Sequence, residues 1–539
     1  MTTRIIDLCI VHGPSRPTEG RENRAPATNL RSVPGPRFIR YAGPNKNRTR
    51  FGAHHRLPGC RHGRVWRVAT WGAAIVAGLL LGDAAGAAEA QGFQAGAAAV
   101  DITPEKFPLS LRGSFTPRPT DSVHDPLHAR ALAMRNGEGR VVIVIVDNLG
   151  VSRETLDEIK ARAAEATGWK TEQMLIAATH THSAPSISGS GGSEAAVACR
   201  EKAAAGILRA ITDAAAALQP ATVAWGSDAV PEEVFNRRWF LKEGVKPANP
   251  FGGTDQVKTN PPRDLLVKPA GPTDPEVSVL DIRTRKRQPL AVLANYALHY
   301  VGGAPAGKIS ADYFGAYAQL MRSRVGGKSP ENFVAMLSNG PCGDINNIDF
   351  AGTRAPRAPF EQIQLVAGKV ADASWRAVRD AERHADVPIG MLQREVELVY
   401  RKPTAEQLEH ARQVLAMPKE EAEKLPSHGL NYAQRIMGAA ERPEKVAVLV
   451  QALRIGDQAM VTMPFEAFVE IGLEIKKKSP FARTFLIELA NGAYGYLPTP
   501  RQHKLGGYET WLGSSHVQED ASEILTRHLL EMLRELAQP

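Results

Sequence analysis

Residues 129–182 read ARALAMRNGEGRVVIVIVDNLGVSRETLDEIKARAAEATGWKTEQMLIAATHTH. Two apolar runs flank a turn rich in glycine and asparagine, which predicts a β-hairpin that ends at Asp147. A helical pattern and a short apolar strand follow, and the strand delivers His180. The predicted elements are a hairpin of Ala129–Arg135 and Val141–Val146, a helix over Arg153–Ala166 and a strand over Met174–Ala178.

A second region has the same order of elements. It predicts a hairpin that ends at Glu466, a helix that ends at Lys478, and a further strand. The predicted strands are Val446–Ile455, Ala459–Met463 and Phe485–Leu489. The two regions have little sequence identity, so the similarity is either an internal structural duplication or a coincidence of pattern.

Two further apolar strands end in polar residues. The strand Pro289–Ala297 is followed by His299, and the strand Asn332–Leu337 is followed by Asn339-Gly340-Pro341-Cys342-Gly343-Asp344. Ligand sites of α/β proteins lie at the carboxyl ends of strands, so we expect these polar segments to converge on one site.

The alternating elements predict an α/β fold with mixed β-sheets flanked by helices, in a single large domain over residues 91–539. The irregular stretch Lys246–Pro275 is long for a plain connection and is a candidate substrate-side loop.

The positive charge is confined to the N-terminal part of the chain. Residues 1–67 hold thirteen Arg and one Lys against three acidic residues, whereas the whole chain has a net charge of +9. With Asp83 and Glu89 also set aside, residues 91–539 are neutral. A nucleic-acid partner requires clustered basic residues on the folded surface, so the composition excludes this class of partner.

Residues 65–90 have the layout of a secretory signal peptide. The apolar run Val68–Leu81 follows basic residues and leads to small residues before Ala90, after which we expect cleavage. The run is too short to span a bilayer, so we expect no permanent membrane anchor and a secreted or periplasmic protein. Residues 1–64 are predicted to be a disordered or misassigned leader, with translation starting near Val65. Cys199 and Cys342 remain in the mature chain, where we expect free or buried thiols.

His180 and His182 are candidate metal ligands. Side chains at i and i+2 of a strand share one face, so both imidazoles could enter the same cavity if the strand continues. Imidazole is the commonest protein ligand for zinc, which needs three or four such donors. A His-x-His segment is equally compatible with a hydrogen-bonded structural pair.

Seven short motifs, in this order, resemble the neutral/alkaline non-lysosomal ceramidase family from about Phe93 onward. They are AVDITP at 99–104, ATHTHS at 178–183, Asn236-Arg237, NYALH at 295–299, Gly343-Asp344, Pro464-Phe465-Glu466 and GYLPT at 495–499. The resemblance implies one zinc ion (Zn2+) held by His180, His299, Glu466 and Tyr496, with Tyr494 as the alternative tyrosine. His182 would then contact the substrate or a ligand, and Arg237 would contact the substrate or the developing oxyanion.

These implied ligands have structural alternatives. His299 and Tyr496 could be core residues, and Glu466 could be an acid at a helix N-terminus. Asp312 is a candidate to orient a ligand histidine, and Asp101 before Thr103-Pro104 is expected to shape a turn.

One position departs from the family pattern. Ceramidases have a serine after the Gly-Asp motif, whereas this chain has Asn346. Asparagine cannot act as a nucleophile, so the resemblance leaves a zinc-activated water that adds to a polarised carbonyl. Asn346 could donate to the oxyanion, and Asp344 or His182 could transfer the proton to the leaving amine.

The sequence therefore predicts a secreted zinc-dependent amidohydrolase that acts on a ceramide-like or other small N-acyl substrate. Family members usually carry a further C-terminal β-sandwich that is not expected here, which leaves the lipid substrate open. A metal-dependent esterase on the same site is one alternative. A non-catalytic relative that binds a lipid or a carbohydrate is another.

Overall fold

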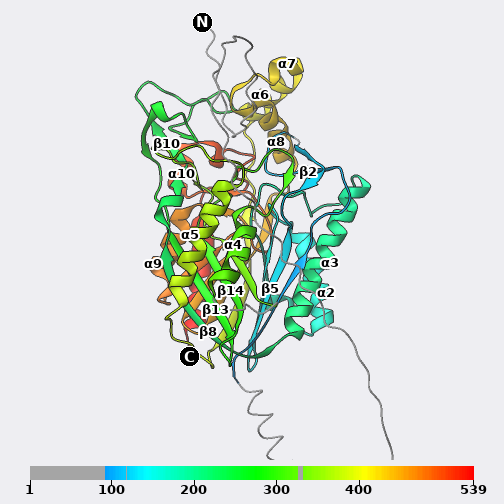
Figure 1. Ribbon diagram of the computed structural model, residues 1–539. Coiled ribbons are helices and arrows are strands. Elements are labelled where there is room, and N and C mark those ends of the chain that lie inside the picture. The colour runs from blue at the N-terminus through cyan, green and yellow to red at the C-terminus, as the bar shows by residue number, and fades with distance from the viewer. Residues whose placement is uncertain (1–91, 117, 326–331, 539) are drawn as a thin grey trace, which may run out of the picture. The chain divides into compact units, whose positions relative to one another are not determined.

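The computed structural model contains the hairpin, helix and strand that residues 129–182 predict (Figure 1). Strand β7 occupies the predicted residues, and the other elements differ from the predicted ranges by one or two residues at their ends. They are β5 (His128–Asn136), β6 (Gly139–Val146), α2 (Arg153–Thr167) and β7 (Met174–Ala178). Helix α2 begins after Ser152, whose side chain accepts a bond from Thr155 N–H, and ends at Gly168 in the left-handed conformation.

The structure describes residues 92–116, 118–325 and 332–538, all of which belong to one unit of the chain. The predicted leader over residues 1–64 and the predicted signal peptide over residues 65–90 lie outside the described residues. None of the described helices has the length and apolarity that crossing a bilayer requires.

The same order of elements occurs three times in the described part of the chain. Each repeat has three antiparallel strands, a helix, a fourth strand parallel to the third, and a closing helix. The first repeat is β1 (Gln94–Asp101), β5, β6, α2, β7 and α3 (Glu194–Ala216). The second is β8 (Gln219–Ala229), β13 (Glu276–Thr284), β14 (Pro289–Tyr296), α4 (Asp312–Arg324), β16 (Val334–Asn339) and α5 (Glu361–Val378). The third is β18 (Ile389–Val399), β19 (Lys445–Ile455), β20 (Gln458–Thr462), α9 (Val469–Lys478), β22 (Arg483–Ile487) and α11 (Ala521–Ala537).

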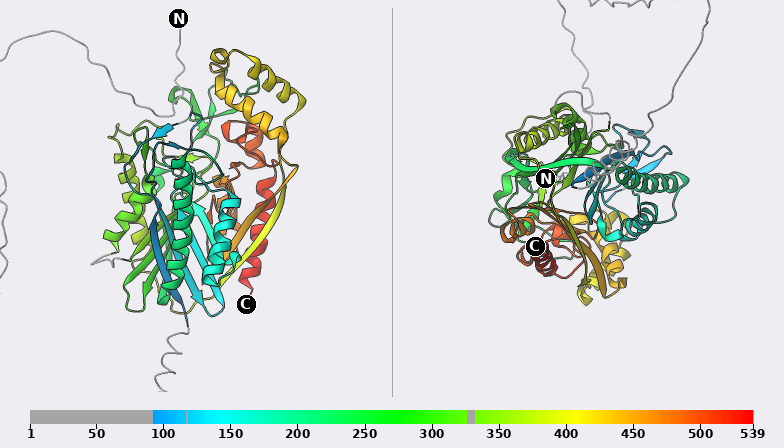
Figure 2. Two further views of the ribbon diagram at one scale, coloured as in Figure 1. Left: turned by 90° about the vertical axis from the view of Figure 1, so that its right-hand side faces the viewer. Right: turned by 90° about the horizontal axis from the view of Figure 1, so that it is seen from below.

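The first and third of these repeats are the two regions with the same predicted order of elements, and the second repeat is a further copy that the sequence pattern did not indicate. The repeats meet around a common centre, with the blue-cyan, green and yellow-to-red groups in separate sectors (Figure 2, right). The first two repeats form one eight-stranded sheet in the order β16-β14-β13-β8-β1-β5-β6-β7. The third repeat forms a separate four-stranded sheet in the order β18-β19-β20-β22.

The strands are apolar on both faces because each sheet is buried on both faces, by helices on the outside and by the other strands of the inner core. Along β6, Val142, Val144 and Val146 pack outward against the helices of their own repeat. The alternate residues Val141, Ile143 and Ile145 pack inward, into a core shared by all three repeats. Uninterrupted apolar runs are typical of strands buried on both faces. The predicted α/β fold with mixed sheets flanked by helices is confirmed.

The third and fourth strands of each repeat end at the same edge of the structure because they are parallel. The second strand is antiparallel to both the first and the third, so the first strand also ends at this edge. Each repeat has an insertion between the end of its first strand and the start of its second. The first insertion carries β2 (Leu109–Leu111), β3 (Arg118–Thr120) and β4 (Ser122–Val123). The second carries β9 (Phe235–Asn236), β10 (Arg238–Leu241), β11 (Val257–Thr259) and β12 (Leu266–Pro269). The third carries α6 (Ala405–Ala416), α7 (Lys419–Ala422) and α8 (Gly429–Glu441).

The stretch Lys246–Pro275 is less irregular than the sequence indicates. Strands β11 and β12 lie within it and pair with the two edges of β10. Elsewhere, Thr103 N–H donates to Asp101 Oδ1 (2.7 Å), which forms the expected turn, and Cys199 and Cys342 are both free and buried.

Lys160 on α2 is buried between the first and third repeats, with 2% of its surface exposed. Its Nζ donates to Asn491 Oδ1 (2.5 Å), and Asn491 Nδ2 donates to Gln451 Oε1 (2.8 Å). Burial lowers the pKa of Lys160 to about 7, although Asp157 on the same helix raises it in part. A neutral amine fits this environment better than an ammonium ion.

This burial predicts a dependence of stability on pH. Between about pH 7 and the ordinary lysine pKa, the unfolded chain binds a proton that the folded chain does not bind, so the free energy of unfolding rises with pH. We expect Lys160→Met to raise this free energy at pH 7 by on the order of 1 kcal/mol and to flatten its rise up to pH 9.5. Urea unfolding at both pH values measures this effect.

Lys170→Met, at an exposed position, is the control and should leave the slope with pH unchanged. An equal slope for Lys160→Met and the wild type would contradict the prediction.

Candidate metal centre

Donor atoms from all three repeats converge where their strands end. His180 follows β7, His299 follows β14, and Glu466 begins the short strand β21 (Glu466–Ala467) after β20. His180 Nε2 lies 3.1 Å from His299 Nε2 and 3.3 Å from Glu466 Oε2, and the last two atoms are 3.8 Å apart. His182 Nε2 lies 3.2 Å from His180 Nε2. The three imidazoles form a group whose nitrogen donors lie within 4.8 Å of one another.

Each imidazole is oriented by a backbone carbonyl at its other nitrogen. His180 Nδ1 lies 2.6 Å from the oxygen of Leu149, and His299 Nδ1 lies 3.2 Å from that of Cys342. His182 Nδ1 lies 3.1 Å from the oxygen of Gly113. A carbonyl oxygen only accepts, so each Nδ1 carries the proton and a neutral ring presents a bare Nε2 lone pair.

Nε2 atoms that approach one another and a carboxylate this closely are stabilised by a cation among them, which is either a proton on His180 or a metal ion. Glu466 Oε2 is buried and has no hydrogen-bond donor among the described residues. Ligands about 2.1 Å from a tetrahedral ion lie roughly 3.4 Å apart, which is close to the separations among His180, His299 and Glu466. The residues therefore fit a bound metal ion.

The charges of these groups are coupled. Burial lowers the pKa of His180, but the negative charge of Glu466 outweighs burial, and the pKa is raised overall. Burial alone would raise the pKa of Glu466, yet His180 and Arg237 lower it. Burial and the neighbouring His180 hold the pKa of His299 well below its usual range, and the same is true of His182. The site thus contains an ionised carboxylate and at least two neutral imidazoles.

Tyr496 lies beside the carboxylate. Glu466 pairs with Tyr496 between the parallel strands β21 and β23 (Tyr496–Leu497), and the tyrosine side chain hydrogen bonds with both Glu466 and Arg237. Tyr494 packs its ring on Phe465 at 5.7 Å. Tyr496 therefore contacts two residues named for the site, and its role as the fourth ligand stays a prediction.

Arg237 is held from two sides. It lies between β9 and β10 of the second insertion, and its Nε donates to Glu509 Oε1 (2.8 Å). One terminal nitrogen donates to the oxygen of Gly343 (2.6 Å), and the guanidinium carbon lies 5.5 Å from the centre of the Tyr496 ring. Burial lowers the pKa of Arg237, but Tyr496 and Glu509 outweigh burial and raise the pKa well above its usual range. A fixed cation therefore lies beside the donor group.

The expected strand geometry of the His-x-His segment is wrong. Strand β7 ends at Ala178, and His180 has a left-handed backbone with φ of 66°. This conformation is unfavourable for a residue with a side chain, and such strain is concentrated at functional sites. The two imidazoles meet because the chain turns, not because it continues as a strand. Gly113 has φ of 87°, and a Cβ atom there would lie 2.4 Å from His182 Nδ1, so this position requires glycine.

Asp344 and Asn346 lie in the loop after β16, and their side chains bond to neighbouring segments. Asp344 accepts from Asn236 Nδ2 (2.7 Å) and Val469 N–H (2.9 Å), and burial raises its pKa to about 6. Asn346, in β17 (Ile345–Asn346), donates to Asn260 Oδ1 (2.6 Å) and accepts from Ile348 N–H. Their catalytic roles stay predictions.

Asp312 does not orient a ligand histidine directly. Its carboxylate accepts from the backbone N–H groups of Val301 (2.9 Å), Gly302 (3.0 Å) and Tyr313 (2.7 Å). It therefore fixes the loop that follows His299.

Several residues of the site were missed by the sequence analysis. The ring of Tyr300 stacks on His182 at 3.9 Å, and Tyr508 meets the ring of Tyr496 edge-on at 5.5 Å. Glu509 bridges Arg237 and Arg238. Adjacency to His299 could have indicated Tyr300, whereas the backbone carbonyls that orient the histidines leave no signal in the sequence.

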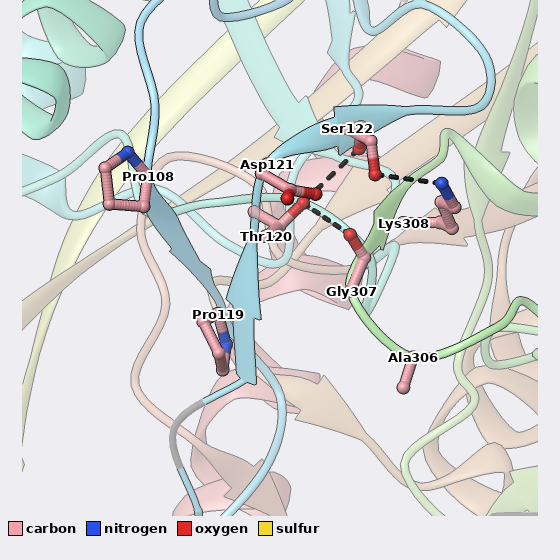
Figure 3. A pocket seen from close by; sticks show the side chains of 8 residues that line it. All are labelled: Pro108, Pro119, Thr120, Asp121, Ser122, Ala306, Gly307 and Lys308. Atoms are coloured by element: carbon pink, nitrogen blue, oxygen red, sulfur yellow. Dashed lines mark hydrogen bonds between the residues drawn. The ribbon is translucent and has the colours of Figure 1, made fainter.

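A hollow of about 350 Å³ lies beside β3 and β4 and the loop that contains β15 (Lys308–Ile309). Thr120 Oγ1 donates to the oxygen of Gly307, and Lys308 Nζ donates to Ser122 Oγ across it (Figure 3). None of its eight lining residues is one of the converging donors. The eight are Pro108, Pro119, Thr120, Asp121, Ser122, Ala306, Gly307 and Lys308.

Residues 93–354 match the family model of neutral/alkaline non-lysosomal ceramidase, N-terminal. A solved ceramidase complexed with C2 is 18% identical, with a TM-score of 0.63, over 83% of this chain and 75% of the other. A neutral ceramidase from Pseudomonas aeruginosa is also 18% identical, with a TM-score of 0.60, over 83% and 74%. At this identity the structures establish the fold. The search of curated proteins gave no match.

The convergence of bare donors predicts that a divalent cation stabilises the fold. We expect a chelator to lower the melting temperature and added Zn2+ to restore it, because an ion that binds only the folded chain contributes about 2.7 kcal/mol at one hundred times its dissociation constant. Calorimetry with and without the ion measures this shift. His180→Ala should abolish the shift, whereas His384→Ala, at a histidine that stacks on Trp225, should keep it.

A shift of equal size in His180→Ala and the wild type would contradict the prediction.

Proposed function

The chain belongs to the neutral/alkaline non-lysosomal ceramidase family, and on this premise we propose that it is a zinc-dependent hydrolase that cleaves a linear N-acyl amide bond. One observation carries the proposal: three imidazole lone pairs and an ionised carboxylate converge within a few ångströms in a buried site. The family supports hydrolase activity, and the donors support a metal-dependent form of it.

Zinc is the ion that suits these donors. Nitrogen from His180 and His299 with oxygen from Glu466 and Tyr496 is a mixed set that zinc accepts in four-coordinate sites. When bound, the ion would lower the pKa of a water molecule and polarise the scissile carbonyl. His182 is the fifth candidate donor, and its ring stacks on Tyr300 beside the group.

The surrounding residues have separate roles in the proposed reaction. Arg237 is fixed by Glu509 and by the carbonyl of Gly343, so it is placed to stabilise negative charge on the carbonyl oxygen. His182 presents Nε2 to the donor group, which supports its proposed role in carrying a proton to the leaving amine, although burial and His180 hold its pKa well below the usual range. Asp344 remains the alternative proton carrier.

No serine nucleophile is needed in this scheme. Asn346 lies two residues after Asp344, and its amide is bonded to Asn260 and Ile348. It serves the proposal as a support for the loop or as a donor to the oxyanion. The proposed substrate is a ceramide-like or other small N-acyl compound, and the proposed location is outside the cell or in the periplasm.

A panel of substrates tests the function. We expect zinc-loaded protein to hydrolyse N-acyl amides of different chain lengths, and we expect His180→Ala to lose at least about a thousandfold in rate together with its zinc. Amine release and metal analysis measure both quantities. Matched esters cleaved in place of amides would make the protein an esterase. Zinc-loaded protein that cleaves neither class would remove the enzymatic proposal.

Arg237 gives a separate test of oxyanion stabilisation. We expect Arg237→Met to lower kcat by about 10²–10³ when both proteins are compared at full zinc occupancy, because this side chain is proposed to stabilise negative charge on the substrate. Full occupancy is required because Arg237 also bonds to Tyr496. Arg383→Met, which removes a remote arginine paired with Asp281, is the control for the loss of a partly buried charge. A kcat within a factor of three of the wild type would exclude the role of Arg237.

A further inference from the structure

Glu488 is a buried acid that the proposed reaction does not use. It is the first residue after β22 and has no exposed surface. None of the ion pairs found among the described residues includes it, so the carboxyl group is satisfied by other donors. A buried carboxyl without a cation destabilises a protein unless hydrogen bonds compensate for its lost hydration.

The donors come from two segments that are distant in sequence, the loop after β16 and the segment that contains strand β21, which are called here the two ligand loops. Glu488 Oε2 accepts from Cys342 N–H (3.1 Å) and from Ala467 N–H (3.0 Å). Glu488 Oε1 accepts from the thiol of Cys342 (2.9 Å). One carboxyl group in the third repeat thus ties the loop after β16 of the second repeat to strand β21.

Both loops act directly on candidate metal ligands. Cys342 supplies the carbonyl that orients His299, and its sulfur lies 3.4 Å from His299 Nδ1. Ala467 follows Glu466 in the chain, so a bond to its N–H fixes the backbone that carries the carboxylate. Glu488 therefore holds the supports of two ligands that come from different repeats.

The contact between the two loops is also close without Glu488. Gly343 N–H donates to the oxygen of Ala467 (2.8 Å). A Cβ atom at Gly343 would lie 2.4 Å from the oxygen of Glu466, which is closer than real Cβ contacts. The two loops are in close contact where Glu488 bonds to both. We therefore expect the loss of a hydrogen bond from this carboxyl group to change the positions of His299 and Glu466.

We infer that Glu488 is a positioning residue that sets the separation between His299 and Glu466 through Cys342 and Ala467. This inference rests on the proposed metal-dependent function. Groups that orient metal ligands from behind typically change metal affinity by about 10- to 100-fold when they are lost. A purely structural role would change the stability of the metal-free protein and leave the affinity of the folded protein for metal unchanged.

The test is the affinity of folded protein for Zn2+ in competition with a chelator, together with the visible spectrum of the Co2+-loaded protein. Glu488→Gln is nearly isosteric, but it replaces one acceptor oxygen with an amide donor. We expect its zinc affinity to fall about 10- to 100-fold and its cobalt bands to change in position and intensity. Unfolding of the metal-free protein shows that each sample is folded.

Asp281→Asn is the matched control. Asp281 is equally buried and is bonded to Arg283 and Arg383, away from the donor group. We expect this variant to keep the wild-type affinity and cobalt spectrum even if its stability falls. If Glu488→Gln does not fold, Glu488→Asp replaces it, because the shorter side chain cannot reach both N–H groups, and the same loss of affinity is expected.

Two outcomes overturn the inference, and they are distinguishable. Folded Glu488 variants with wild-type zinc affinity and cobalt bands overturn the positioning role and leave the proposed function in place. Wild-type protein that binds neither ion overturns the proposed function and the inference with it.

Discussion

Three imidazole rings each donate Nδ1–H to a backbone carbonyl, and this constraint determines the chemistry of the site. The carbonyls belong to Gly113, Leu149 and Cys342, which lie in three separate loops. Because these bonds fix the tautomer, the Nε2 lone pairs must face one another beside an ionised carboxylate. The arrangement is electrostatically unfavourable unless a cation, either a proton on His180 or a metal ion, lies among these atoms. The surrounding scaffold therefore has to hold the donors in place without help from the donors themselves.

The scaffold holds them by placing one strand end from each repeat at the same edge of the structure. His180, His299 and Glu466 belong to the first, second and third repeat respectively, so no repeat contains a complete site. The sheets behind the donors share an inner core in which Leu132, Leu293 and Leu453 are fully buried. Packing at this density resists small displacements, which allows the strained backbone at His180 to persist. The packing of the inner core therefore also supports the geometry of the site.

The sequence predicted individual helices and strands better than the way in which they are arranged in space. Hydrophobic period and turn residues located β5, β6, α2 and β7 because these signals are local. The second repeat was not recognised as a copy because the same backbone path needs a similar pattern of buried positions, and the residues at those positions can differ. The His-x-His spacing indicated two residues that the structure brings together, but not their geometry, since strand period says nothing about a left-handed turn after Ala178.

The remaining parts of the site could not be predicted from residue types. Backbone carbonyls orient all three imidazoles, and every residue has a carbonyl group. Glu488 and Glu509 follow apolar or aromatic segments and have no motif of their own, so their roles depend on neighbours that are distant in sequence. Tyr496 was preferred over Tyr494 from its motif, and the strand pairing with Glu466 supports that choice.

The position of the three insertions has a consequence for how new substrates can be accommodated. Each insertion begins where the first strand of its repeat ends, so all three emerge around the donors rather than beneath them. One supplies the carbonyl of Gly113, another supplies Arg237, and the third packs Arg435 against Phe115 of the first, 4.6 Å from its ring centre. Length and composition can change in these segments without moving the strands that carry the ligands. Because Gly113 and Arg237 lie in two of these segments, an exchange of loops between relatives has to keep both residues, and the rest of each insertion can then vary with the substrate while the ligands stay in place.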